Sequence, residues 1–154
     1  HIKAYYDEFY NIYSGIAEWQ DKLKRGVLKN GIVQNPSGRQ YYWPDVKRNA
    51  SGKVSYSTQI VNYPVQGFSA DIMQLACIRA LRTFQEHGMR SRLILTVHDS
   101  IVVDTHPDEI DMVSDLVTEA MTGAVGEAEQ LWGYKLVVPL EVEVSSGKSW
   151  ADCK

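Results

Sequence analysis

The sequence predicts an α+β fold in which an antiparallel sheet is backed by helices, with further helices and a β-ribbon near the N-terminus. Two observations support this fold class. Apolar residues recur at three- and four-residue steps in three stretches, which is the period of a helix with one buried face. Between the last two stretches, short runs rich in β-branched residues flank the pair His98-Asp99, a pattern typical of a β-hairpin.

Residues 1–60 are predicted to form two helices, a ribbon and a surface connection. One apolar stripe runs through the first stretch, and Gly15 is expected to divide it into two helices. We interpret the aromatic members of this stripe as core residues rather than as a platform for stacking bases. The turn-forming run 35–38 (Asn-Pro-Ser-Gly) predicts a β-ribbon over Gly31–Trp43, followed by a polar surface segment at 45–57. The stripe consists of Ile2, Tyr5, Phe9, Ile12, Ile16, Trp19 and Leu23.

Residues 61–154 are predicted to supply the sheet and two helices that cover it. A helical pattern follows Gly67 and is expected to end near Gly88, and a second helix is expected to begin at Pro107, whose fixed φ suits a first turn. The run Leu136–Val144 is rich in β-forming residues and is expected to pair beside the hairpin. The predicted buried faces comprise Ile72, Leu75, Ala76, Ala80 and Phe84 in the first helix, and Ile110, Val113, Leu116, Val117, Ala120 and Met121 in the second.

Composition indicates a protein with one core and no membrane segment. The 154 residues, 44% of them hydrophobic, are enough for one sizeable core. No apolar run approaches the roughly 20 residues needed to cross a bilayer, and the N-terminus lacks the pattern of a secretion leader. We therefore expect a cytoplasmic location. Cys77 and Cys153 lack ligand-like spacing, so two reduced thiols are expected.

The charges are unevenly distributed along the chain, whose net charge is -3. Residues 1–60 hold nine Lys and Arg against five Asp and Glu, a net charge of +4, whereas residues 61–154 hold seven against fourteen, a net charge of -7. A basic first part is suited to lie along phosphates, where each neutralised charge releases counterions. A solvated helix face around Lys22 and Lys29 explains the same charges equally well.

The pair His98-Asp99 is the main candidate for chemistry. At the tip of a hairpin, with Ser100 beside it, Asp99 is expected to project outward from a rigid support. Asp is also a common turn residue that hydrogen-bonds its own backbone. The pair by itself therefore does not distinguish a metal ligand from an ordinary turn residue.

Several motifs, in the same order along nearly the whole chain, resemble those of family A DNA polymerases. The segment Val97-His98-Asp99 resembles the third conserved motif of that family. One short motif would be weak evidence, but several matches in register are much stronger. The other matching segments are Phe9 with Tyr13-Ser14-Gly15-Ile16 and Trp19, Gly38-Arg39 with Tyr42 and Pro44, Asn62-x-Pro64-x-Gln66-Gly67-x-x-Ala70-Asp71-Ile72, and Glu143-Val144 with Gly147 and Trp150.

The resemblance implies a fold, an activity and a cofactor. Residues 1–60 would be the end of the fingers and residues 61–154 the C-terminal part of the palm, with a palm-type sheet. The reaction would be template-directed transfer of a nucleotide to a primer 3′-hydroxyl, assisted by two Mg²⁺ ions on carboxylate ligands. Asp99 would be one catalytic metal ligand, and His98 a catalytic-site residue that contacts the end of the primer.

The resemblance also implies that Asn62, Gln66 and Arg39 contact DNA, together with His98. Asn62 and Gln66 would face the minor groove, whose recurring acceptors let an amide check the geometry of a pair without choosing its sequence. From spacing alone, Asn62 could instead be a helix cap and Gln66 could merely open a helix. Asp71 is expected to make a structural hydrogen bond in a buried helix.

Two parts of the family pattern have no counterpart in this sequence. These are the strand motif that bears the other catalytic Asp, and the fingers helix that binds the incoming triphosphate. We therefore expect an upstream part, in the same chain or in a separate subunit, to supply the second carboxylate of the metal site. The chain alone is expected not to polymerise DNA. Its expected partners are that upstream part, primer-template DNA and deoxynucleoside triphosphates, in a bacterial or phage-infected cell.

At two positions the sequence departs from the family pattern. Ser100 stands where the family commonly has Glu, and Thr58 stands where bacterial repair enzymes tend to have Arg, which resembles phage-type members. The chain could be a non-catalytic DNA-binding or assembly module of polymerase ancestry. It could also be a metal-dependent nuclease that uses His98, Asp99 and Asp104, although strand alternation does not put all three on one face.

Overall fold

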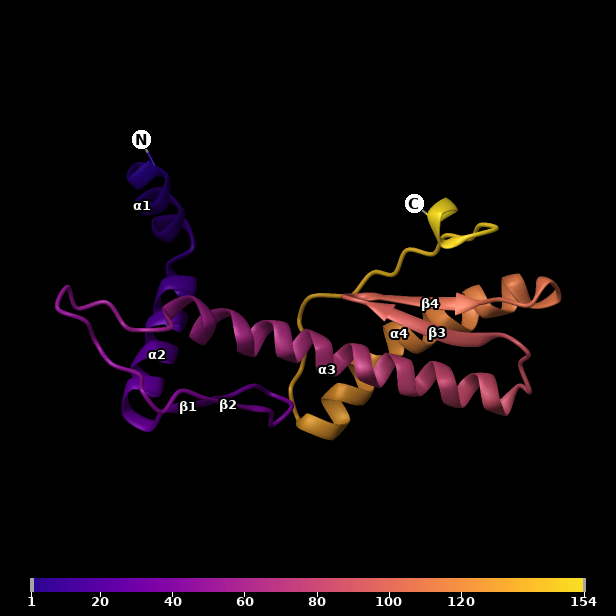
Figure 1. Ribbon diagram of the computed structural model, residues 1–154, viewed down its shortest axis with the longest axis horizontal. Coiled ribbons are helices and arrows are strands. Elements are labelled where there is room, and N and C mark those ends of the chain that lie inside the picture. Colours follow the sequence, from indigo (N-terminus) through magenta and orange to yellow (C-terminus); the bar gives the residue numbers. More distant parts are fainter. Residues whose placement is uncertain (1, 154) are drawn as a thin grey trace. The chain divides into compact units, whose positions relative to one another are not determined.

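The computed structural model describes residues 2–153 and confirms the α+β class. The chain divides after Gly67 into two compact units, called here the first unit and the second unit. Helix α3 (Ser57–Glu86) contributes to both, and the expected boundary after residue 60 falls inside it. The assignment of the two parts to fingers and palm stays a prediction. Figure 1 labels the elements in chain order.

Two helices open the first unit, α1 (Ile2–Ile12) and α2 (Ser14–Asn30). The predicted break is confirmed, but it lies at Tyr13, and Gly15 falls in the first turn of α2. Helix α2 ends where Gly31 adopts a φ of 70° and donates its N–H to the Val27 carbonyl. A left-handed residue that satisfies a terminal carbonyl is a common helix ending, and Gly adopts it without steric cost.

Most of the apolar stripe of these helices is exposed, which corrects the prediction, and only its last member, Leu23, packs on a core cluster. Helix α1 has no buried residue, and Ile2 and Ile12 are 77% and 66% exposed. The period of a sequence identifies an apolar face but does not tell what covers it. The core of the first unit instead consists of Val27, Trp43, Val54 and Ile60.

The β-ribbon is confirmed, with β1 (Ile32–Gln34) antiparallel to β2 (Gln40–Tyr42). The buried Asn35 holds the turn between them, because its side-chain oxygen accepts from the Arg39 N–H at 3.0 Å and from the Ser37 hydroxyl at 2.6 Å. Such local side-chain bonds are the reason that Asn favours turns.

Helix α3 begins at Ser57, ten residues before the expected start at Gly67, and Pro64 lies inside it. Proline lacks an N–H and disfavours helical geometry in the preceding residue, so local preference does not favour a helix through Pro64. Packing overrides this preference, since Ile60 and Pro64 are both buried. Asn62 and Gln66 are therefore helical, and the alternatives in which they cap or open a helix are wrong.

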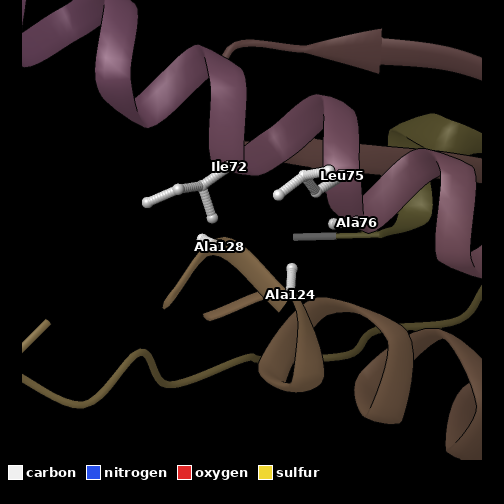
Figure 2. Packing of buried hydrophobic residues seen from close by; sticks show 5 residues of the cluster. All are labelled: Ile72, Leu75, Ala76, Ala124 and Ala128. Carbon is white, nitrogen blue, oxygen red and sulfur yellow. The ribbon is translucent and has the colours of Figure 1, made fainter. Parts of the chain in front are cut away.

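In the second unit, α3 packs against α4 (Ile110–Trp132). Figure 2 shows Ile72 and Leu75 of α3 pointing toward Ala124 and Ala128 of α4, which are fully buried. Small residues let the two backbones approach closely. Farther along α4, Ile110 was predicted to be buried but is exposed, because it is the first residue of the helix.

The predicted hairpin is confirmed as β3 (Arg92–Val97) antiparallel to β4 (Ser100–Asp104). Leu93 of β3 and Val103 of β4 pack on a buried cluster formed by Phe84, Met89, Val113 and Val117. Both strands are thereby fixed to α3 and α4 through side chains of the inner face. Figure 1 shows the two strands side by side.

The expected third strand is absent from the described residues, where this sheet has two strands only. Leu136 packs on the core of the second unit, but Val137 is 87% exposed and the run Leu136–Val144 is irregular. Pro139 lacks the N–H that a position in a β-ladder requires. Among the described residues, no strand pairs with this run. Short 3₁₀ turns complete the unit, η1 (Pro107–Glu109) before α4 and η2 (Trp150–Asp152) near the end.

No helix among residues 2–153 is long and apolar enough to span a membrane. Cys77 and Cys153 are free, as predicted. Burial raises the pKa of the Cys77 thiol, which disfavours the reactive thiolate.

Candidate functional site

The tip of the β3–β4 hairpin is a two-residue turn made of His98 and Asp99. Val97 and Ser100 are paired across its base, and the Ser100 hydroxyl donates to the Val97 carbonyl at 2.8 Å. His98 has a φ of 55°, in the left-handed region, and both tip side chains are exposed. The tip is thus a short, closed turn at the end of two strands that pack on helices.

Asp99 has no hydrogen bond or ion pair within the part of the chain that the structure describes. In residues 2–153 there is also no group of three His, Cys, Asp or Glu side chains that could hold a metal ion. Asp104 lies opposite Arg92 at the far end of the hairpin. The three residues of the nuclease alternative, His98, Asp99 and Asp104, are therefore not brought together.

The base of the hairpin is held by one carboxylate. Glu109 of η1 accepts from the Ser91 hydroxyl at 2.6 Å, from the Ser91 N–H at 2.9 Å and from the Arg90 N–H at 3.0 Å. The Ser91 hydroxyl in turn accepts from the His106 N–H at 2.9 Å. These bonds connect the residue before β3 with the residues after β4, so both ends of the hairpin meet at Glu109.

The hydrogen bonds to Glu109 make the stability of this junction dependent on pH. Bonds from the Ser91 hydroxyl and the Arg90 N–H, followed by the Ser91 N–H and the Arg90 guanidinium, lower the pKa of Glu109 from its ordinary 4.5 to about 2. A pKa that folding lowers contributes stability that is present above pH 4.5 and is lost as the pH falls toward 2.

Glu109→Gln is therefore expected to destabilise the second unit at pH 7. The difference in unfolding free energy from the unmodified chain should shrink as the pH falls from 4.5 toward 2. Denaturant unfolding at several pH values, with amide exchange at Ser91 as the local probe, measures this. The exposed Glu119→Gln on α4 is the control. A constant difference across that pH range would show that the Glu109 charge does not stabilise the junction.

The predicted DNA-contact residues of the first unit are also exposed. Asn62 and Gln66 lie one helical turn apart on α3, so their side chains share a face. Gly67 follows, and the ribbon approaches α3 so closely there that a Cβ on Gly67 would overlap the Tyr41 hydroxyl and lie 3.5 Å from Cδ of Arg39. The fold thus brings Arg39 near the segment that contains Gln66.

Two supporting features were not found from the sequence. Glu109 and Ser91 are 18 residues apart, and neither lies in a motif that suggests a pair. Tyr41 lies in the predicted ribbon range, but no sequence pattern indicated that its hydroxyl fills the space beside residue 67, where only Gly fits. The glycine directly after Gln66 was the one available signal, since Gly inside a helix often marks a close approach.

Comparison with known proteins identifies the family. A family model described as DNA polymerase family A matches residues 1–152. The thermostable DNA polymerase I of Thermus aquaticus is 31% identical over 153 residues, which are 99% of this chain and 17% of the relative. DNA polymerase I of Caldicellulosiruptor bescii is 32% identical over 149 residues, 96% of this chain and 16% of the relative.

A solved structure is also similar, the POL domain of Pol1 from M. smegmatis in complex with DNA primer-template and dNTP. Its TM-score is 0.83 with 29% sequence identity, and the match covers 98% of this chain and 25% of that chain. The chain thus spans about one sixth of the curated relatives and a quarter of the solved domain. The family model, the relatives and the similar fold agree, and the chain belongs to DNA polymerase family A.

Proposed function

We propose that this chain is the C-terminal part of the polymerase domain of a template-directed DNA polymerase, and that Asp99 is one of its catalytic metal ligands. The observation that supports this most directly is the exposed carboxylate of Asp99, which has no partner within residues 2–153, at the tip of a hairpin fixed to two helices. A carboxylate held in this way is available to a ligand from outside the chain.

The donor set fits half of a magnesium site. Mg²⁺ prefers hard oxygen ligands, and the two carboxylate oxygens of Asp99 are of that kind. When bound, a pair of such ions stabilises the attacking and leaving oxygens of nucleotide transfer. The second carboxylate would come from the upstream part of the polymerase. This chain would therefore position one ligand and would not extend a primer by itself.

The other site residues would bind the duplex. The exposed His98 ring would donate to the last phosphate or sugar of the primer. Asn62 and Gln66, on one face of α3, would donate to minor-groove acceptors, and Arg39 would contact the DNA beside them. In this proposal residues 1–60 belong to the fingers and residues 61–154 to the palm.

In the complete enzyme, the partners of this chain would be primer-template DNA, deoxynucleoside triphosphates and the upstream part, in the cytoplasm of a bacterial or phage-infected cell. Primer extension by the chain combined with the rest of the polymerase domain tests the proposal. Mg²⁺-dependent extension is the expected result, and its absence from a folded, DNA-bound assembly would contradict it.

Gln66→Ala tests the minor-groove role in the complete polymerase. We expect discrimination against a mismatched primer end to fall about five- to tenfold, because one hydrogen bond contributes about 1 kcal/mol and 1.4 kcal/mol corresponds to a factor of ten. Extension rates from matched and mismatched primers measure this ratio. Gln74→Ala, another exposed amide on α3, is the control. Equal discrimination in both variants would contradict the minor-groove role of Gln66.

A further inference from the structure

His98 has an unusual backbone for its residue type. Among residues 2–153, only two residues other than glycine have a positive φ, Tyr56 and His98. The turn has two residues and Asp99 is not among those with a positive φ, so the left-handed residue comes first. Hairpin turns with this arrangement strongly favour glycine at the first position, because a Cβ there crowds the backbone.

We propose that the left-handed backbone of His98 positions Asp99 for catalysis, in addition to any contact that the ring makes. This inference rests on the proposed function of Asp99 as a metal ligand. His98 would thus be a positioning residue that acts through Asp99. The φ of residue 98 decides in which direction the following carboxylate leaves the tip.

The contacts that hold the hairpin lie away from its two-residue tip. The strands are fixed by Leu93 and Val103 on the inner cluster, and the open end is fixed at Glu109. At the tip, the Ser100 hydroxyl closes the turn on the Val97 carbonyl. In contrast, neither tip side chain makes a hydrogen bond within the described residues. The backbone of residues 98 and 99 therefore determines where the carboxylate of Asp99 lies.

The role of the backbone can be separated from that of the ring by substituting residue 98. Glycine adopts positive φ freely and asparagine tolerates it, whereas alanine disfavours it and the β-branched valine disfavours it most. The left-handed cost changes the population of the turn by roughly five- to thirtyfold. All four replacements remove the imidazole equally, so differences among them report the backbone.

The experiment measures single-turnover nucleotide addition by the complete polymerase with His98→Gly, His98→Asn, His98→Ala or His98→Val. We expect the Gly and Asn variants to agree within about threefold and the Val variant to be at least roughly tenfold slower. The Val variant should also need more Mg²⁺ to reach half of its maximal rate. Its affinities for primer-template and for the nucleotide should equal those of the Gly variant.

Three results would overturn the inference. Equal rates in all four variants would show that any role of His98 belongs to its imidazole ring and not to its backbone. A slow Val variant with an unchanged Mg²⁺ midpoint and a lowered melting temperature would indicate hairpin stability instead. Slow Gly and Asn variants beside a fast Val variant would reverse the predicted order. Asp99→Ala, measured in parallel, separates these results from a failure of the proposed function. Full activity of that variant would show that Asp99 is not a metal ligand.

Discussion

Asp99→Ala in the complete polymerase is expected to lower the rate of nucleotide addition roughly a thousandfold, because a lost metal ligand removes several kcal/mol of charge stabilisation from the transition state. Primer-template affinity should change little, since it depends mainly on contacts to phosphates. Single-turnover extension and DNA titration measure the two effects separately. The side chain is exposed, so the substitution leaves the packing of the hairpin intact.

Asp104→Ala is the matched control. Asp104 is also an exposed carboxylate of the hairpin, but it lies at the opposite end of β4. Its replacement should leave the rate close to that of the unmodified enzyme, because the side chain lies away from the tip. Full activity of the Asp99→Ala variant, with tight DNA binding, would contradict the metal-ligand role. That outcome would favour a non-catalytic module that only supports DNA binding.

Phe84→Ala is expected to destabilise the second unit by about 3–5 kcal/mol, the usual cost of removing a buried aromatic ring. Phe84 is 4% exposed and lies in the cluster on which Leu93 and Val103 pack. The cavity would loosen the hairpin from the helices as well as weakening the core. Urea unfolding of the chain measures the loss.

Ile78→Ala is the control for this stability prediction. Ile78 lies on the same helix but is 42% exposed, so its replacement should cost about 1 kcal/mol or less. If the two variants were equally stable, the cluster around Phe84 would not be the support of the hairpin. Amide exchange in β3 should rise in the Phe84 variant and not in the control.

The hairpin could be predicted because its signals are local. β-Branched runs of strand length, separated by a polar turn, specify a two-stranded pairing without help from distant parts of the chain. The ribbon was found for the same reason, since Asn35 holds its turn through neighbouring residues. Helix α4 follows a proline whose φ suits a first turn, and Val113, Val117 and Ala120 of its predicted inner face are buried, whereas Ile110 is not.

The errors arose where distant contacts decide the outcome. Packing around Ile60 keeps α3 helical through Pro64, and a local rule cannot anticipate this. The apolar face of α1 and the run from Leu136 have the periods of a buried helix and of a strand, but α1 has no buried residue and, among the described residues, no strand pairs with the run. A periodic pattern specifies a face, and the neighbours of that face come from the whole fold.

The roles of the candidate site residues stay a prediction, and the contacts that support these residues were not predicted from the sequence. His98, Asp99, Asn62, Gln66 and Arg39 were singled out through the motifs they share with a family. Their exposure in the structure agrees with roles in binding. The bond between Glu109 and Ser91 and the φ of His98 were not predicted, because both depend on geometry that common residue types do not signal.

The central claim is that this chain holds one half of a two-carboxylate metal site. Primer extension by the purified 154-residue chain, with Mg²⁺ and all four nucleotides, tests it most directly when the Asp99→Ala chain is assayed beside it. We expect no extension above the level of the variant. Extension by the unmodified chain that the Asp99 substitution abolishes would mean that these residues form a complete site, and would contradict this claim.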